Sequence, residues 1–445
     1  MCFRGTFTNI SKLIKIKYAL KLGKFYKCLF FNHYLEIYNM AFGNLEVDVL
    51  IAGGGLVGGS LAVGLVEGGM TVAVVDNLSQ KDVVDAGFDG RAAAIAISSK
   101  KALNSLGLWK KIEPEASPIK EIRVSDADSI FFLHFDHKDV ETEAFGYMVE
   151  NRNFRKSLVA RFDMLENLTL LAPNTITNVE RNSGDVQATL ADGKIVTAKL
   201  IVGAEGRRSP TRDKAGIKLT SWPYKQCGIV CTVAHELSHD QVAHEHFLPS
   251  GPFAILPLQN NHSSIVWTER KDLVMQIMGL GEADFLTELK KRFGNFLGEL
   301  KVVGPRWSYP LALQFAERAV DQRLALVGDA YHGIHPIAGQ GLNMGLRDIA
   351  VLAELLTDGK RLGLEPGDAT ILNSYERRRR FDNTLMLAST DMLNRLFSND
   401  VEPIRIARDL GLASVNMFPP LKKLFMKLAM GMVGDLPRLM RGDSL

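Results

Sequence analysis

A strand, a glycine-rich turn, a helix and a second strand follow one another in residues 47–76, and this order constrains the fold more than any other part of the chain. Residues 47–52 are a short apolar run, residues 60–66 begin an apolar helical pattern, and residues 71–75 are a second apolar run that ends at Asp76. Two strands joined through a helix lie parallel in one sheet. The pattern therefore predicts an α/β fold with a Rossmann-like domain.

The turn between the first strand and the helix carries three glycines with G-x-G-x-x-G spacing. The first glycine permits the tight turn, the second lets the backbone approach a pyrophosphate, and the third lets the helix pack closely on the strand. An acid at the end of the second strand would accept a hydrogen bond from a ribose hydroxyl. The spacing indicates a dinucleotide but does not separate FAD from NAD. The predicted contacts are Gly53, Gly55, Leu56, Val57, Gly58 and Asp76.

A second ligand-binding pattern lies in the C-terminal half of the chain. The apolar residues 324–328 lead to Asp329, and a loop that ends in Gly-Gln-Gly leads to an apolar helical pattern over residues 349–356. This order places a buried aspartate beside a ligand and aims the N–H groups of a helix N-terminus at it. Such an end favours an anion, and an isoalloxazine ring becomes an anion when reduced, so the pattern favours a flavin. The predicted contacts are Asp329, Gly339, Gln340, Gly341, Leu342 and Asn343.

The run from His335 to Asp348, together with Gly328 and Asp329, resembles the second flavin motif of the FAD-dependent aromatic hydroxylases. Within that group it is most similar to the ubiquinone-biosynthesis hydroxylases of the 2-polyprenylphenol and 2-polyprenyl-6-methoxyphenol type. The resemblance implies a fold like that of para-hydroxybenzoate hydroxylase. In that fold a discontinuous Rossmann-like FAD-binding domain is combined with a β-sheet substrate domain.

The same resemblance implies an FAD-dependent monooxygenase that hydroxylates the ring of a polyprenylated phenol in ubiquinone biosynthesis. NADPH or NADH would reduce FAD as a transient co-substrate, and O2 would react through a flavin C4a-hydroperoxide. The backbone of residues 339–343 would stabilise the reduced flavin, and Asp329 would hold its ribityl chain. No residue is clearly a general base, so the sequence assigns no catalytic residue.

Two alternatives stay open beside this interpretation. The chain could encode a related FAD-dependent hydroxylase that acts on a soluble aromatic compound. It could also be a flavin-holding scaffold subunit, associated with other ubiquinone-biosynthesis proteins and with little activity of its own. Oxidation of NADPH that is stimulated by a phenol would exclude the scaffold.

Three further charged residues are assigned to the cofactor through the resemblance. Arg91 stands where the family has an arginine near the flavin and its pyrophosphate, although a surface loop would also explain it. Arg155 belongs to a segment that opens a helix over FAD in the family, and a structural salt bridge is the alternative. Glu205 follows the apolar run at residues 200–202, where the family pattern has Asp. Its side chain is one methylene longer, which leaves open the group that it holds.

The length of 445 residues is enough for two domains. The β-branched runs at residues 228–234, 254–258 and 264–268 predict a mixed or antiparallel sheet, which would form a floor under the substrate. We expect an extension over 1–39, an FAD-binding domain over 40–115, 146–220 and 316–395, a substrate domain over 116–145 and 221–315, and a C-terminal helical segment over 396–445.

Two short patterns imitate metal sites. Residues 235–239 match the H-E-x-x-H zinc signature, but that signature needs a helix to bring both histidines to one side. Here a β-branched run leads directly into it, which favours a strand. Cys227 and Cys231 lie on the same predicted strand and are interpreted as two small buried residues. No metal site is expected.

The first 39 residues differ in charge from the remainder. They hold seven of the 53 lysine and arginine residues and one of the 50 acidic residues, so they carry +6 and the remainder carries −3. The basic balance of the chain therefore gives no argument for nucleic-acid binding. A membrane or targeting segment, a disordered tail and a non-native upstream stretch all stay open. We favour the last, because Met40 lies seven residues before the first predicted strand.

Two segments near the C-terminus have competing interpretations. Residues 375–381 contain four consecutive arginines, and we expect a solvated helix face there rather than contacts to a lipid or NADPH phosphate. Residues 417–430 have lysines on one side of a helix and apolar side chains on the other. This second pattern fits core packing and an interfacial membrane helix equally well.

Composition bears on the compartment. No run of eighteen apolar residues occurs, so no transmembrane helix is expected. The four cysteines, at positions 2, 28, 227 and 231, do not form a disulfide framework. The simplest setting is a reducing cytoplasm, with peripheral contact to the inner face of the membrane as an option.

Overall fold

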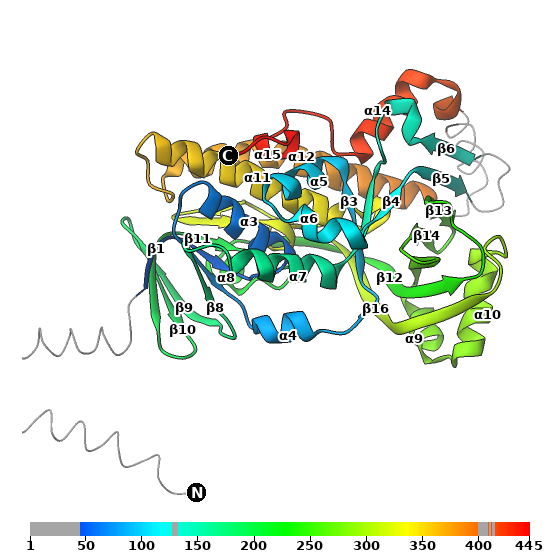
Figure 1. The fold of residues 1–445 in the computed structure, drawn as a ribbon, viewed down its shortest axis with the longest axis horizontal. Coiled ribbons are helices and arrows are strands. Elements are labelled where there is room, and N and C mark those ends of the chain that lie inside the picture. Colours follow the sequence, from blue (N-terminus) through cyan, green and yellow to red (C-terminus); the bar gives the residue numbers. More distant parts are fainter. Residues whose placement is uncertain (1–44, 127–131, 399–407, 409–410, 412–413) are drawn as a thin grey trace, which may run out of the picture.

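The computed structural model describes residues 45–126, 132–398, 408, 411 and 414–445 (Figure 1). The predictions for residues 1–39 and for a start at Met40 lie outside the described residues. Within them the chain forms two large sheets and one small sheet, with helices packed on both large sheets. The expected α/β architecture is confirmed.

The first large sheet, called the parallel sheet below, has a parallel core with the order β18-β11-β1-β2-β8. Its central strands are buried on both faces, which is why they read as unbroken apolar runs in the sequence. The predicted strands before Gly53, Asp76 and Glu205 are confirmed. The strands are β1 (Leu45–Ala52), β2 (Val72–Val75), β8 (Leu168–Leu171), β9 (Ile176–Arg181), β10 (Val186–Leu190), β11 (Ile195–Gly203), β17 (Val320–Asp321) and β18 (Leu324–Leu326).

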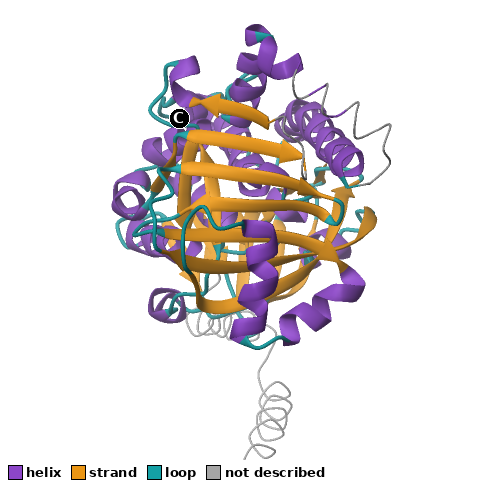
Figure 2. Ribbon diagram, turned by 90° about the vertical axis from the view of Figure 1, so that its right-hand side faces the viewer, coloured by secondary structure: helices purple, strands orange, loops and turns teal. Residues whose placement is uncertain are grey.

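The second large sheet, called the mixed sheet, has the order β19-β16-β12-β15-β14-β13-β5-β6. Only the β13–β5 pair is parallel, so the prediction of a mixed or antiparallel sheet is confirmed. Figure 2 shows its strands side by side across the molecule. The strands are β5 (Glu121–Asp126), β6 (Phe132–Asp136), β12 (Leu219–His235), β13 (Val242–Leu248), β14 (Gly251–Pro257), β15 (His262–Arg270), β16 (Leu300–Ala316) and β19 (His332–Gly333).

A small three-stranded sheet has the spatial order β3-β7-β4. It comprises β3 (Ala92–Ala96), β7 (Gly146–Glu150) and β4 (Ser117–Ile119). Side chains from β3 and β7 pack against the mixed sheet around Ala243 and Leu258. This small sheet therefore joins the two parts of the molecule.

The helices divide between the two parts. Helices α3, α7 and α11 belong to the main core with the parallel sheet, while α9 and α10 cover the outer face of the mixed sheet. The helices are α3 (Leu56–Glu67), α4 (Gln80–Asp85), α5 (Ile97–Ser105), α6 (Trp109–Ile112), α7 (Asn151–Phe162), α8 (Pro210–Lys214), α9 (Lys271–Gly279), α10 (Glu282–Phe293), α11 (Gln340–Arg361), α12 (Ala369–Phe397), α14 (Pro419–Ala429) and α15 (Arg438–Arg441). The described part of the chain also has four 3-10 turns: η1 (Glu113–Glu115), η2 (His137–Val140), η3 (Gly328–Ala330) and η4 (Ile337–Gly339).

The long helix α12 crosses the molecule from the parallel sheet to the mixed sheet (Figure 1). Its residues 375–381 form the predicted solvated face only in part. Tyr375 and Arg379 are fully buried, and only Arg377, Arg380 and Phe381 are exposed. The four consecutive arginines did not indicate which of them is buried, because neighbouring positions of a helix face different directions.

Residues 417–430 pack in part against the body of the molecule, since Met426 and Met430 are buried in one cluster with Ile97 and Phe145. The interfacial membrane helix stays a prediction. In α15, Leu439 and Met440 join the main core. In α14, Met426 alone is buried, while Phe418 before it and Leu424 and Phe425 within it are exposed. No helix in the described part of the chain has the length and apolarity needed to cross a membrane.

Candidate cofactor and substrate site

The three glycines of the first motif differ in what surrounds them. Gly53 has a φ of +99°, and a Cβ there would lie 2.6 Å from the carbonyl oxygen of Ala204. A Cβ on Gly58 would lie 2.0 Å from the carbonyl oxygen of Gly53, so this glycine brings α3 against the end of β1. A Cβ on Gly55 would meet no protein atom within 4 Å. The first and third glycines are thus required by packing, and the second borders open space suited to a ligand.

The N-terminus of α3 begins at this open space. No side chain caps it, and Gly55 is the N-cap residue. The first N–H groups of a helix have no partner within the helix, so they can bind an anion such as a pyrophosphate. Asp76 lies beside the turn, where its Oδ2 accepts a hydrogen bond from the Gly54 N–H at 2.7 Å. A carboxylate oxygen can accept a second bond, so this contact leaves Asp76 able to bind a hydroxyl.

Val57 connects the two ligand-binding motifs. A Cβ on Gly345 of α11 would lie 2.8 Å from Val57 Cγ2, and a Cβ on Gly328 would lie 3.3 Å from the same side chain. Because both positions are glycine, α3 and α11 approach closely at their N-terminal ends. The two motifs, almost 300 residues apart in the chain, therefore border one site.

The N-terminus of α11 repeats the features of α3. Gly339 is its N-cap with a φ of +61°, no side chain caps the helix, and a Cβ on Gly341 would meet no atom within 4 Å. Asn343 is committed elsewhere, since its amide donates to the Ala94 carbonyl and accepts from the Ala96 N–H, both at 2.9 Å. Its side chain ties α11 to β3, so the predicted contact of Asn343 with the flavin rests on its backbone.

Asp329 is not the buried acid that the sequence predicted. Its side chain is 43% exposed, and its Oδ2 accepts a bond from Arg207 Nε at 3.2 Å. The buried acid is Asp348, which lies on the inward face of α11. The two differ because Asp348 has cationic and polar partners in the core, whereas Asp329 is partly exposed and pairs only with Arg207 among the described residues.

The carboxylate of Asp348 anchors the loop that carries Asp329. Its Oδ2 accepts from the Gly328 N–H at 3.0 Å and lies 2.6 Å from His332 Nε2. Its Oδ1 accepts from Arg379 Nε at 2.7 Å. Burial opposes ionisation, but His332 and Arg379 outweigh it and hold the pKa of Asp348 at about 2. Sequence reasoning missed this network; the available signal was a charged residue within an apolar helical pattern.

Three other predicted cofactor residues differ in their contacts within the protein. Arg91 bonds Asp89 at 2.6 Å and lies over the ring of Trp307. The carboxylate of Glu205 accepts from Ser209 Oγ at 2.5 Å and from the Thr211 N–H at 3.2 Å, so it holds the start of α8. Arg155 is half-buried on α7 and has no ion pair with any described residue. Their contacts with a flavin stay predictions.

His335 lies in the loop before α11 and was not singled out from the sequence. It is fully buried, and neither ring nitrogen has a hydrogen-bond partner among the described residues. Its ring meets that of Tyr224 edge-on at 5.3 Å, and burial lowers its pKa to about 4. A buried polar group without a partner is costly, so the imidazole is a group that a bound ligand would satisfy.

The H-E-x-x-H pattern at residues 235–239 and the Cys227–Cys231 pair do not have the geometry of metal ligands. His235 ends β12 and its Nδ1 lies 2.7 Å from the Leu237 carbonyl, while His239 Nε2 lies 2.7 Å from the Leu258 carbonyl. The segment therefore continues a strand into a turn, and the helix that the zinc signature needs is missing there. Cys227 and Cys231 are buried on β12, as predicted.

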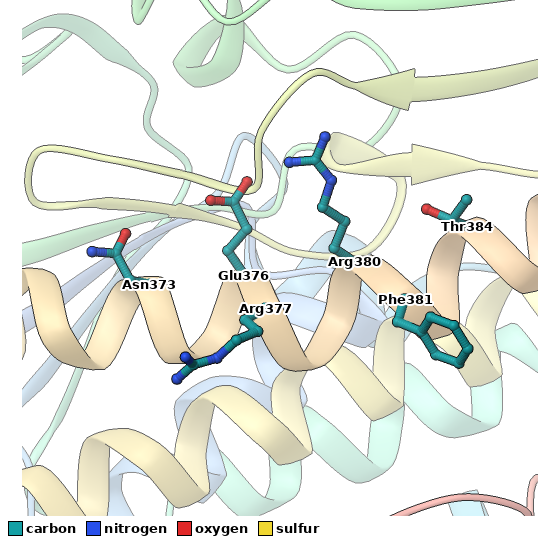
Figure 3. A pocket seen from close by; sticks show the side chains of 6 residues that line it. All are labelled: Asn373, Glu376, Arg377, Arg380, Phe381 and Thr384. Carbon is teal, nitrogen blue, oxygen red and sulfur yellow. The ribbon is translucent and has the colours of Figure 1, made fainter.

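A groove of about 650 Å³ runs along the outer side of α12 (Figure 3). It includes none of the glycine-motif residues. The side chains of Arg377, Arg380 and Phe381 project from the helix there. For these residues the predicted solvated helix face is correct. The groove is lined by Asn373, Glu376, Arg377, Arg380, Phe381 and Thr384.

The residues present fit FAD. Two uncapped helix N-termini, each beside a glycine that borders open space, suit the two negatively charged parts of a reduced flavin dinucleotide. Asp76, at the first motif, and Asp329, at the second, each provide a carboxylate that can accept a hydrogen bond from a hydroxyl group of the cofactor.

Comparisons with known proteins agree with this geometry. The FAD binding domain family matches residues 46–388. Ubiquinone hydroxylase UbiL of Rhodospirillum rubrum is 52% identical over 401 residues, which cover 89% of this chain and 93% of that protein. The 3-demethoxyubiquinol 3-hydroxylase of Escherichia coli is 32% identical over 391 residues, 87% of this chain and 100% of that protein. The crystal structure of p-nitrophenol 4-monooxygenase PnpA from Pseudomonas putida matches 88% of this chain and 100% of its own, with a TM-score of 0.74 and 19% identity, a likeness of fold alone.

Proposed function

The chain belongs to the family of FAD-dependent hydroxylases of ubiquinone biosynthesis, and from this premise we propose that it hydroxylates the ring of a polyprenylated phenol with NAD(P)H and O2. The observation that carries the proposal is the junction of the two glycine motifs at Val57. This junction brings together two helix N-termini, each of which can bind an anion. Two of the relatives are named for hydroxylation of ubiquinone or a ubiquinol precursor, which supports the substrate class.

The protein's part is to bind, to orient and to exclude water. The N-terminus of α3 would hold the pyrophosphate, with Asp76 on the ribose. The N-terminus of α11 would face the flavin ring, with Asp329 on the ribityl chain. When bound, FAD supplies the redox chemistry that activates O2. Arg91, Arg155 and Glu205 remain proposed cofactor contacts beside these groups.

The test uses the full chain reconstituted with FAD. NADPH consumption is followed in air with a phenol that carries a short prenyl tail, with the unprenylated 4-hydroxybenzoate, and with neither. We expect faster oxidation with the prenylated phenol, together with a product heavier by one oxygen atom in mass spectrometry. Hydroxylation of 4-hydroxybenzoate instead would favour a soluble substrate. Bound flavin without phenol-stimulated oxidation would overturn the proposal and favour the scaffold.

We also propose that α14 brings the protein to a membrane surface, where a polyprenylated substrate would be dissolved. The exposed apolar side chains lie close together in sequence: Met417 is 83%, Phe418 59%, Leu424 46% and Phe425 44% exposed. The lysines at 423 and 427 are also exposed, which suits anionic headgroups. An apolar patch of this kind with basic neighbours is typical of an interfacial helix.

Flotation with lipid vesicles tests this proposal. We expect the full chain to float with vesicles that contain anionic phospholipid, and the Phe418→Ser/Phe425→Ser double variant to stay behind. Leu362→Ser is the matched control, because Leu362 is 79% exposed but lies at the end of α11. Equal flotation of all three proteins would overturn the role of α14.

A further inference from the structure

Glu245 lies in the middle of β13, on the face of the mixed sheet that faces the FAD-binding part. Successive side chains of a strand point to opposite faces, so Ala243, Glu245 and Phe247 share one face. Ala243 packs in one cluster with Met148 of the three-stranded sheet. Phe247 stacks on Phe397 of α12, with ring centroids 4.1 Å apart. Glu245 is therefore placed between the two elements that close over this face.

The opposite face of β13 is distinct. His244 lies against Phe296, with ring centroids 4.8 Å apart, on the side that α9 and α10 cover. His246 stacks on His244 and its Nδ1 lies 2.6 Å from Ser125 Oγ. Glu245 shares no contact with these groups, because its side chain emerges on the other side of the sheet.

The face that carries Glu245 adjoins the flavin loop. Ala92 and Ala94 of β3 pack against the cluster around Ala243. A Cβ on Gly339 would lie 3.1 Å from Ala94 Cβ, and the Ala94 carbonyl accepts the bond from Asn343. Through these contacts the N-terminus of α11 and the sheet face with Glu245 border the same interior region.

The immediate surroundings of Glu245 are apolar. Its register partners are Val124 on β5 and Ala254 on β14, and Val266 on β15 continues the row. Its carboxyl group makes no hydrogen bond or ion pair with any described residue, and burial alone raises its pKa to about 8. Three pairs of charged groups on or beside the surrounding elements bind one another: Asp126 with Arg408, Glu150 with Arg152, and Asp391 with Arg395.

We propose that Glu245 is the acid–base residue that binds the ring hydroxyl of the phenol substrate and accepts its proton during hydroxylation. This inference rests on the proposed function. The phenol O–H bond breaks, its proton moves to the carboxylate, and the electron pair stays on the oxygen. That oxygen then donates into the ring and makes the attacked carbon more nucleophilic. The ring carbon then loses its own proton to water, which makes the ring aromatic again and leaves a phenolate oxygen, and Glu245 returns its proton to that oxygen.

The test compares wild type with Glu245→Gln and Glu245→Asp, each loaded with FAD. Glu282→Gln is the matched control, because Glu282 is exposed on α10 behind the opposite face. Calorimetric titration with a short-tailed prenylated phenol, in two buffers of different ionisation enthalpy, counts the protons exchanged on binding. We expect Glu245→Gln to lose this exchange, Glu245→Asp to retain it, and the control to match wild type.

Turnover provides the second measurement. We expect kcat of Glu245→Gln to fall about 10²–10⁴-fold, the usual contribution of an acid–base group. The plot of kcat against pH for wild type should have a limb near pH 8, and this limb should be missing in Glu245→Gln. An unchanged proton count and an unchanged pH profile in Glu245→Gln would overturn the inference. If Glu245→Gln fails to fold, a wild-type profile without a limb between about pH 7 and 9 would overturn it as well.

The inference and the proposed function can fail separately. Wild type that binds the phenol with a Glu245-dependent proton exchange but forms no hydroxylated product contradicts the proposed function and keeps Glu245 as a phenol-binding group. Normal hydroxylation by Glu245→Gln, with the wild-type pH profile, keeps the function and removes Glu245 from it.

Discussion

Arg379 donates from its Nε to Oδ1 of Asp348 at 2.7 Å, and neither side chain is more than 1% exposed. The other oxygen of Asp348 accepts the backbone N–H of Gly328, directly before the predicted flavin contact Asp329. A buried ion pair on two helices therefore fixes the start of the cofactor loop. Its role is to position the loop, because the pair lies beneath the site and borders no open space.

Replacement of Arg379 tests this role. Arg379→Met leaves the Asp348 carboxylate buried with a partner missing, so we expect the free energy of unfolding to fall by about 3–5 kcal/mol. FAD should also dissociate more readily. Urea unfolding and fluorescence titration with FAD measure the two effects. Arg377→Met, at an exposed position two residues earlier, should change stability by less than about 0.5 kcal/mol. Equal effects of both variants would contradict the assignment.

The glycine that borders open space in α11 gives a second prediction. Gly341→Ala should leave the apoprotein as stable as wild type, or more stable by about 0.5–1 kcal/mol, because alanine favours a helix. It should weaken FAD binding at least tenfold if the ring lies against this backbone. Gly58→Ala should instead destabilise the apoprotein, since its Cβ would collide with the Gly53 carbonyl. Unchanged FAD affinity in Gly341→Ala would exclude the ring from this helix end.

The buried imidazole of His335, which has no hydrogen-bond partner among the described residues, gives a third prediction. Because neither nitrogen has a described partner, His335→Leu removes a buried polar group without breaking a bond. We expect the free energy of unfolding to stay the same or to rise, by at most about 1–3 kcal/mol, and we expect hydroxylation to slow. Thermal unfolding of the apoprotein and product formation by the loaded enzyme check the two parts. Marked loss of stability with full activity would show that the imidazole serves packing and not a ligand.

Glu245 predicts an unusual dependence of stability on pH. Its pKa rises from 4.5 in the unfolded chain to about 8 in the folded protein, so between these values the folded state holds a proton that the unfolded state has lost. The stabilisation is complete below about pH 4.5 and is lost as pH rises through 8, at up to about 1.4 kcal/mol per pH unit. Relative to wild type, Glu245→Gln should gain stability steadily from pH 5 to 8. Unfolding curves whose midpoints shift in parallel across this range would contradict it.

Much of the fold and part of the site could be predicted from local sequence. The strand before Gly53, the strand ending at Asp76 and the helix after Gly339 all lie where the pattern placed them. The steric requirements at Gly53 and Gly58 also agree with the prediction, whereas the contact of Gly55 with a pyrophosphate stays a prediction. The exposure of Arg379 and the burial of Asp329 were predicted wrongly. In both cases a residue was judged by its neighbours in the chain, whereas its environment is made by elements distant in sequence.

The sequence by itself determined the strand, turn and helix units and their affinity for a dinucleotide. Glycine conformation, apolar periodicity and uncapped helix ends act over a few residues and need no other part of the chain. Tertiary structure alone decided that Asp348 pairs with Arg379, that His335 has no hydrogen-bond partner among the described residues, and that Glu245 has apolar neighbours in the sheet. These properties depend on burial and on the charges brought within a few ångströms by packing. Both follow from how sheets and helices meet, and no short segment encodes them.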